Sequence, residues 1–183
     1  MLRRITRVLG SSRRRLRIPE GRAGEVQSGA VPYAWVDDEP AYLLITSRRT
    51  RRWIFPKGAV AHAMTAQASA AKEAWEEAGV RGEIGDHALG RYHTEKVDGR
   101  RRRWIAVELY PLLVTKQAED WPERRGRRRH WATHRQARRL IDNPELVALL
   151  DHLHARLKKA GRPTETADAP PRGGQPRKRS STK

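Results

Sequence analysis

"GAVAHAMTAQASAAKEAWEEAGV", residues 58–80, is the stretch that decides the fold. Its second half is rich in alanine and other strong helix formers. Thr65 suits the residue that caps the beginning of a helix, and Gly79 suits the position just beyond its end. The stretch therefore predicts a helix that begins near Thr65 and stops before Gly79.

Three carboxylates belong to this predicted helix: Glu73, Glu76 and Glu77. Their positions, i, i+3 and i+4, place them on one side of the helix, where like charges repel one another. Such a group needs a compensating cation. One interpretation is a solvated acidic face balanced by neighbouring lysine and arginine side chains. The other is a bound metal, and oxygen ligands favour a hard ion such as Mg²⁺ or Mn²⁺.

The sequence before this helix predicts strands. "SGAVPYAWV" and "AYLLITS" are rich in β-branched and aromatic residues and flank the turn-like "DDEP", which predicts a hairpin or two adjacent strands. "RRWIFP" predicts a further short strand that Pro56 closes, and "KGAVAHAM" predicts a loop.

After the helix, more strands and then two helices are predicted. "LGRYHTEKV" and "RRWIAVELYPLLV" have strand patterns separated by the turn "DGRR", and "RRRHWA" predicts another strand. "THRQARRLI" and "NPELVALLDHLHARLKK" predict helices, the second with Asn143 as its N-cap and Pro144 at its first position. This order predicts an α/β or α+β fold with a mixed sheet.

Composition favours an anionic partner. The chain carries 39 Lys and Arg against 21 Asp and Glu, a formal net charge of +18. Residues 1–24 predict a basic arm, disordered or in a short helix, residues 25–159 a single domain, and residues 160–183 a disordered tail. The basic ends predict nonspecific contact with polyanions. The chain lacks cysteine and an apolar run long enough to span a membrane, so a soluble cytoplasmic protein is expected.

The stretch from Gly58 to Val80 resembles the Nudix box. In that pattern a glycine precedes five residues, a glutamate, seven residues, and then Arg-Glu-apolar-any-Glu-Glu-any-Gly-apolar. Two positions depart from it, because Met64 replaces the first glutamate and Lys72 replaces the arginine. The positions that match are Gly58, Glu73, Ala74, Glu76, Glu77, Gly79 and Val80.

The flanks extend the resemblance from about Gln27 to Leu140. "SGAVPYAW", "YLLITSRRTRRWIFPKG" and "WPERRGRRRHWAT" are similar to the branch of the Nudix superfamily that hydrolyses diadenosine and diphosphoinositol polyphosphates. The resemblance implies an α/β/α sandwich with a mixed β-sheet.

The resemblance also implies site residues. Glu76 and Glu77 would bind Mg²⁺, or Mn²⁺ in its place, with Glu77 foremost. Glu73 would be a ligand or the base that activates water, and the Gly58 carbonyl would complete the metal shell. Lys72 keeps the charge of the box arginine, and Glu95 is a further candidate carboxylate downstream. The substrate phosphates would meet a basic group made of Arg48, Arg49, Arg51, Arg52 and Lys57.

The function expected from this pattern is metal-dependent hydrolysis of a phosphoanhydride bond in a polyphosphorylated small molecule. Diadenosine polyphosphates and diphosphoinositol polyphosphates are the expected substrates. Two alternatives stay open at this point. The enzyme could act on ADP-ribose or another nucleoside diphosphate derivative. Met64 could instead mark a weakened site in a module that binds nucleic acid or nucleotides. The sequence leaves the oligomeric state open.

Overall fold

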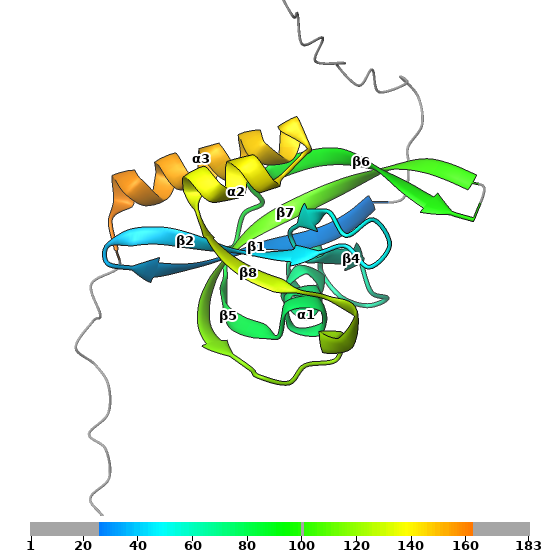
Figure 1. The fold of residues 1–183 in the computed structure, drawn as a ribbon, viewed down its shortest axis with the longest axis horizontal. Helices are drawn as coiled ribbons and strands as arrows, with labels where there is room; N and C mark the ends of the chain where they lie inside the picture. The colour runs from blue at the N-terminus through cyan, green and yellow to red at the C-terminus, as the bar shows by residue number, and fades with distance from the viewer. Residues whose placement is uncertain (1–25, 100, 163–183) are drawn as a thin grey trace, which may run out of the picture.

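The computed structural model of the chain describes residues 26–99 and 101–162. They form an eight-stranded mixed sheet with three α-helices and one short 3-10 helix (Figure 1). The predicted arm, and the predicted tail from residue 163 onward, lie outside the described residues. The elements are β1 (Val26–Val36), β2 (Glu39–Thr46), β3 (Trp53–Ile54), β4 (Lys57–Ala59), α1 (Ala66–Ala78), β5 (Val80–Ile84), β6 (Gly90–Asp98), β7 (Arg101–Gln117), η1 (Arg124–Gly126), β8 (Arg129–Thr133), α2 (His134–Leu140) and α3 (Pro144–Ala160).

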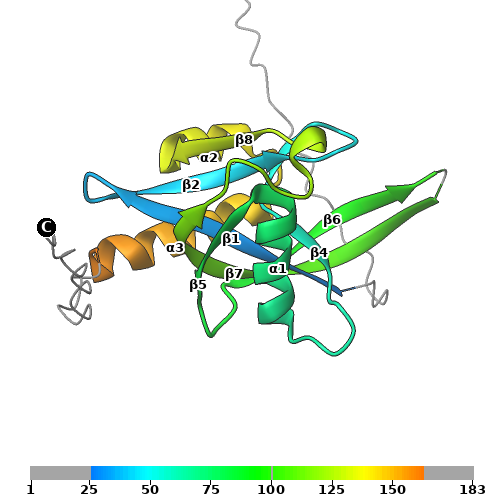
Figure 2. The ribbon, with the colours of Figure 1, turned by 90° about the horizontal axis from the view of Figure 1, so that it is seen from below.

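The helices cover the two faces of the sheet. α1 packs on one face, and α2 and α3 pack on the other, as Figures 1 and 2 show from two directions. Each face has its own apolar core. The core under α2 and α3 includes Tyr42, Tyr92 and Leu150, and the core under α1 includes Leu43 and Ala74. The expected α/β/α sandwich is confirmed.

The sheet combines antiparallel and parallel pairs, as predicted. β1 and β2 form the expected antiparallel hairpin, in which Tyr33 pairs with Tyr42. Asp37 and Asp38 at its turn have φ values of 47° and 60°, the left-handed conformation that tight hairpin turns require. β1 also runs parallel to β7, with a register that begins at Val26 opposite Ala106. This parallel pair makes the sheet mixed.

Helix α1 begins and ends as the sequence predicts. The Thr65 hydroxyl accepts a hydrogen bond from the Ala68 backbone N–H at 3.0 Å, which satisfies one of the unpaired donors of the first turn. Gly79 adopts the left-handed conformation with φ of 66° and closes the helix. Both predicted end residues are therefore confirmed.

Two strands were not predicted. The expected loop 57–64 begins with strand β4, in which Gly58 pairs with Ser28 of β1. β5 follows α1 and pairs antiparallel with β7. Neither segment has an alternating pattern of its own, so each becomes a strand because a long neighbour supplies hydrogen-bonding groups. β4 matters for function because it lies beside α1.

The last two helices confirm their predicted starts. Thr133 caps α2 in a capping box with Gln136. The Asn143 side chain accepts hydrogen bonds from two backbone N–H groups at the start of α3, where Pro144 occupies the first position.

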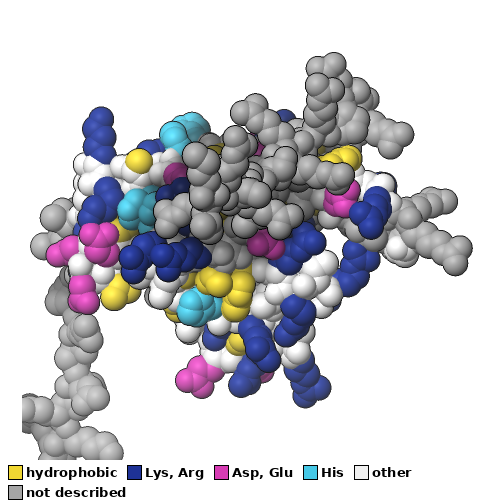
Figure 3. All heavy atoms as spheres, turned by 45° about the horizontal axis from the view of Figure 1, so that its top comes forward, with side chains coloured by type: hydrophobic (Ala, Val, Ile, Leu, Met, Phe, Trp, Pro, Cys, Tyr) yellow, Lys and Arg dark blue, Asp and Glu magenta, His cyan; other side chains and the backbone are white. Residues whose placement is uncertain are grey.

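No helix in the described ranges is long and apolar enough to cross a bilayer. On the face drawn in Figure 3, lysine and arginine side chains are spread widely, with acidic side chains among them.

Candidate active site

Alanine side chains set the position of the acidic helix on the sheet. Ala70, Ala74 and Ala78 of α1 are completely buried against the sheet. A methyl group is the smallest side chain that can fill such an interface, so the helix backbone lies close to the strands. The carboxylates at the C-terminal end of α1 are consequently brought against β4 and its flanking residues.

Glu77 is buried and bound on both oxygens. Its Oε2 accepts a hydrogen bond from the Lys57 backbone N–H at 3.0 Å. Its Oε1 accepts from Nη2 of Arg127, which is buried as well. Arg127 also donates to Glu123 Oε2 at 2.6 Å and to the Thr46 carbonyl at 3.1 Å. Burial, aided by Arg48, lowers the pKa of Arg127 to about 10, so Arg127 remains a cation at neutral pH.

Glu76 and Glu73 have different surroundings. Glu76 forms an ion pair with Lys72 at 2.5 Å near the surface. Glu73 forms no hydrogen bond or ion pair with the described residues. Burial, and secondly the charge of Glu76, raise the pKa of Glu73. A side-chain carbon added to Gly58 would overlap the Glu73 carboxylate, which therefore lies directly against β4.

The carboxylate and carbonyl oxygens around this helix end are ligands that suit a hard divalent ion. They do not surround a common point in this structure. Within the described ranges no three His, Asp or Glu side chains form a ready-made metal site. Glu73 nevertheless combines partial burial with an unpaired charge, which a cation would stabilise. Each oxygen of Glu77 accepts a hydrogen bond and retains a further acceptor position. Glu73 therefore fits the role of a metal ligand best, and Glu77 and the Gly58 carbonyl are neighbouring oxygen donors.

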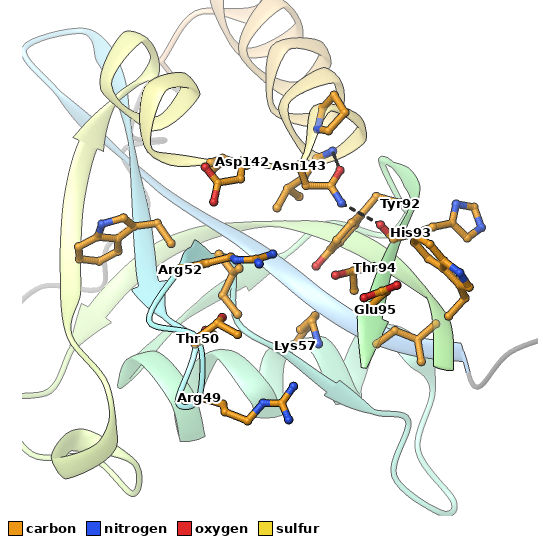
Figure 4. Close-up of a pocket in the computed structure, with 18 of the residues that line it drawn as sticks. Arg49, Thr50, Arg52, Lys57, Tyr92, His93, Thr94, Glu95, Asp142 and Asn143 are labelled. Carbon is orange, nitrogen blue, oxygen red and sulfur yellow. Dashed lines mark hydrogen bonds between the residues drawn. The ribbon is translucent and has the colours of Figure 1, made fainter. Parts of the chain in front are cut away.

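A pocket of about 770 Å³ lies where the turn after β2, the β4 residue Lys57, strands β6 and β7, and the start of α3 meet. Arg49, Thr50 and Arg52 enter it from the turn between β2 and β3, and Lys57 enters from β4 (Figure 4). Lys57 connects the pocket to the carboxylates, because its side chain lines the pocket while its backbone N–H binds Glu77. The remaining walls come mainly from β6, β7 and the start of α3, and they include Tyr92, His93, Thr94, Glu95, Arg102, Trp104, Asp142 and Asn143.

Hydrogen bonds fix the far wall of this pocket. The Asn143 amide donates to the His93 carbonyl at 2.8 Å, and the His93 backbone N–H donates to Glu145 Oε2 at 2.7 Å. These bonds join β6 to the beginning of α3, and Figure 4 shows the one between Asn143 and His93. In the same pocket, the Glu95 carboxylate forms an ion pair with Arg102 at 3.3 Å. Glu95 thus lies in the pocket, with a cation already beside it.

The predicted phosphate-binding residues are divided between two places. Arg49, Arg52 and Lys57 line the pocket together. Arg51 instead donates to the Gly126 carbonyl at 2.9 Å. Arg48 lies 3.5 Å from Glu123 and lines a separate hollow of about 640 Å³. The turn that carries all four arginines therefore separates the two hollows.

A segment that sequence reasoning used for the family resemblance and for a predicted strand also holds the end of the acidic helix. We call residues 118–129 the strap. The Trp121 indole donates to the Glu77 carbonyl at 3.2 Å, and the Glu123 backbone N–H donates to the Glu76 carbonyl at 3.1 Å. Arg129 donates to the Ala78 carbonyl at 3.0 Å. These bonds satisfy carbonyl groups in the last turn of α1.

Sequence reasoning missed Arg127 as a residue of this site. It lies in the run "RRGRRRHW", and no local feature distinguishes it from the exposed arginines on either side. Its partner Glu77 is 50 positions away in the chain. Only the rest of the sequence, through the return of the strap to α1, determines which arginine of the run becomes buried.

Comparison with known proteins places the chain among related sequences. The profile of the NUDIX domain matches residues 29–155. The chain is 32% identical over 136 residues to "Nudix hydrolase 17, mitochondrial" of Arabidopsis thaliana, an alignment that covers 70% of this chain and 73% of the relative. It is 31% identical over 145 residues to "Diphosphoinositol polyphosphate phosphohydrolase 3-beta" of Bos taurus, which covers 74% and 81%.

Solved structures share the same fold. A C. elegans Ap4A hydrolase in a binary complex has a TM-score of 0.57 at 20% identity, covering 73% of this chain and 98% of that one. The NUDIX domain of Shewanella oneidensis NrtR, solved with ADP ribose, has a TM-score of 0.58 at 17% identity, covering 78% and 94%. The domain match extends over most of the described residues and includes the whole acidic helix, and on this ground the chain belongs to the Nudix family of hydrolases.

Proposed function

We propose that the protein hydrolyses a phosphoanhydride bond in a polyphosphorylated small molecule with the help of a divalent metal. One observation carries this proposal. Glu73, a partly buried carboxylate without an ion pair among the described residues, lies in the second half of α1 beside β4. β4 also contributes Lys57 to a pocket that contains Arg49 and Arg52. An unpaired carboxylate and several phosphate-binding cations are thus joined by one short strand.

Glu73 would hold Mg²⁺, or Mn²⁺ in its place, together with Glu77 and the Gly58 carbonyl. When bound, such an ion lowers the pKa of water and neutralises charge on phosphate oxygens. Arg127 and the Lys57 N–H keep the Glu77 carboxylate in a fixed orientation. Glu76 is paired with Lys72 near the surface, so it would be at most a peripheral member of the proposed metal ligands.

The residues of the chain account for the other needs of hydrolysis. Arg49, Arg52 and Lys57 would bind the phosphates and orient the scissile bond. Water attacks phosphorus, a new P–O bond forms, and the bridging P–O bond breaks with its electron pair remaining on the leaving phosphate. Glu73 would act in one of two roles: it would either hold the ion or, as the base, accept the proton of the attacking water.

Diadenosine polyphosphates are the first substrates to test. Trp53 and Trp104 line the same pocket as the cations, so the pocket offers both aromatic faces and positive charge. A molecule with bases and a phosphate chain uses both features. Inositol pyrophosphates, which carry charge on all sides, use only the cations. The names of the C. elegans structure and the Bos taurus relative support testing both classes.

The test is release of phosphate or nucleotide from diadenosine polyphosphates, inositol pyrophosphates, ADP-ribose and nucleoside triphosphates, with Mg²⁺ and with Mn²⁺. Glu73→Gln is expected to lower turnover by about 10²- to 10⁴-fold, the range that general acid–base groups supply. Glu83→Gln, the same change at an exposed glutamate of β5, is the control and should be silent.

Glu73→Gln is a cleaner probe than Glu77→Gln, because the latter would leave the buried cation of Arg127 without its partner. A folded wild-type protein that cleaves none of these compounds with either metal would contradict the proposal. That outcome would favour a module that binds nucleotides or nucleic acid without turnover. Cleavage of ADP-ribose alone would place the enzyme with the nucleoside diphosphate pyrophosphatases.

A further inference from the structure

Most carboxylates around the end of α1 already have a cation of their own. Glu76 has Lys72 at 2.5 Å, and Glu77 has Arg127. Glu123 of the strap has Arg127 at 2.6 Å and Arg48 at 3.5 Å. Only Glu73 forms no ion pair with the described residues. Three of these four carboxylates, Glu76, Glu77 and Glu123, are therefore already paired with a cation before any metal binds.

The two cations that hold α1 carboxylates differ in burial. The Lys72 side chain is 42% exposed, whereas that of Arg127 is 6% exposed. Water and salt screen an exposed charge, so the field of Lys72 on its surroundings is weak. The field of a buried charge is much stronger, because the effective dielectric constant around it is lower.

Arg127 is also fixed in place. Its Nε, Nη1 and Nη2 donate to acceptors on three separate parts of the fold: Glu123 of the strap, the Thr46 carbonyl at the end of β2, and Glu77 of α1. A guanidinium held by three acceptors cannot move aside as a lysine could. A divalent cation that approaches Glu77 therefore meets a stationary positive charge.

We propose that Arg127 is a resident counterion that opposes metal binding at the acidic helix, so that the metal binds firmly only together with a polyanionic substrate. This inference rests on the proposed function, because it concerns the same metal and the same substrate class. The phosphates of the substrate, held by Arg49, Arg52 and Lys57, would supply negative charge in place of that of Glu77, which Arg127 neutralises. Arg127 is thereby a positioning residue for Glu77 and a determinant of binding order.

The first test measures Mn²⁺ affinity of the full-length protein by electron paramagnetic resonance, with metal alone. Arg127→Met removes the buried charge at similar length and is expected to tighten Mn²⁺ binding by at least about tenfold. Lys72→Met, the matched change at the exposed cation, should alter the affinity by less than about threefold. Arg127→Lys keeps the charge on a side chain that can move aside, so its Mn²⁺ affinity should lie between those of wild type and Arg127→Met.

These variants distinguish a charge effect from a structural one. If Arg127 only supported the fold, Arg127→Met and Arg127→Lys would weaken Mn²⁺ binding together. Unchanged or weaker binding by a folded Arg127→Met protein would overturn the inference. Circular dichroism shows whether the variant folds, which is a real concern because the change leaves Glu77 and Glu123 without their buried partner.

The second test needs only the wild-type protein. A diadenosine polyphosphate analogue with methylene bridges, which cannot be hydrolysed, is added at a fixed concentration. The protein and analogue together should retain Mn²⁺ at least about tenfold more tightly than either does alone. Equal Mn²⁺ affinity of the protein with and without the analogue would overturn the inference even if Arg127→Met does not fold. A folded protein that binds no Mn²⁺ in either condition and cleaves no substrate would instead refute the proposed function.

Discussion

Helices α1 and α3 pack on opposite faces of one sheet with side chains of different size. α1 buries Ala70, Ala74 and Ala78, whereas α3 buries Leu146, Leu150 and Leu153. The alanines allow close approach, which brings the Glu77 carboxylate within 3.0 Å of a backbone N–H next to the sheet. The leucines bury far more apolar surface per residue. The comparison teaches that one helix is placed for chemistry and the other contributes more to stability.

The largest expected loss of stability comes from the leucine helix. Leu150 is completely buried, so Leu150→Ala should lower the free energy of unfolding by about 2–5 kcal/mol. Urea denaturation measures this change. Turnover per folded molecule should stay within about twofold of wild type, because α3 residue Leu150 does not line the pocket. A large fall in turnover at full folding would break the division between the two helices.

A larger side chain on the alanine helix is expected to act on both properties. Ala74→Leu inserts a bulky group at a completely buried contact with the sheet and should cost about 1–3 kcal/mol of stability. It should also displace the carboxylates and lower turnover by about a hundredfold. Ala148→Leu, at an exposed position of α3, is the control and should change neither. Normal turnover in folded Ala74→Leu would show that close packing of α1 is dispensable.

A smaller effect on stability is expected from the unpaired carboxylate. Burial, and then Glu76, raise the pKa of Glu73 above its ordinary value of 4.5, so the folded protein binds this proton more readily than the unfolded chain does. Ionised Glu73 therefore destabilises the metal-free protein at neutral pH. Glu73→Gln removes two like-charge pairs on α1 and should stabilise it there by roughly 0.5–1 kcal/mol.

The pH dependence of this gain tests its cause. The advantage of Glu73→Gln should shrink as the pH falls through the raised pKa of Glu73, and it should vanish below the ordinary value of 4.5. Thermal melts of both proteins in a metal chelator between neutral and acidic pH measure it. A difference that stays constant over this range would show that the gain has another origin than the charge of Glu73.

The smallest effect is expected at Met64, where the family pattern has a glutamate. Met64 is 37% exposed and precedes α1, at the opposite end of the helix from Glu76 and Glu77. Met64→Glu should change stability by less than about 0.5 kcal/mol, as exposed substitutions usually do, and turnover by less than about twofold. A rise in turnover of tenfold or more would show that this position limits the active site.

Local signals were sufficient to predict much of the fold. The ends of α1 at Thr65 and Gly79, and the cap of α3 at Asn143, follow from the chemistry of residues within one turn of each helix. β4 and β5 were not predicted, because their strand conformation comes from pairing with β1 and β7. The parallel register of β1 and β7 likewise joins distant segments that share no local pattern.

The candidate site also combines features that local sequence predicts with features that depend on distant segments. Helical spacing predicted that Glu73, Glu76 and Glu77 share one side of α1. It could not predict which of them is buried, exposed or unpaired, because those properties depend on Arg127 and on β4. The metal roles assigned to these residues, and the cytoplasmic location, remain predictions.

The bond between the Trp121 indole and the Glu77 carbonyl also provides a spectroscopic probe. The chain has six tryptophans, so protein labelled with 5-fluorotryptophan should give six ¹⁹F resonances. The Trp121 resonance, identified by its loss in Trp121→Phe, would respond to small movements of the helix end when metal or substrate binds. Trp35 lies in the β1–β2 hairpin, and its indole nitrogen is buried without a hydrogen-bond partner in the described part of the chain. Its resonance would serve as an internal reference, so binding at the carboxylates could be followed in solution without turnover.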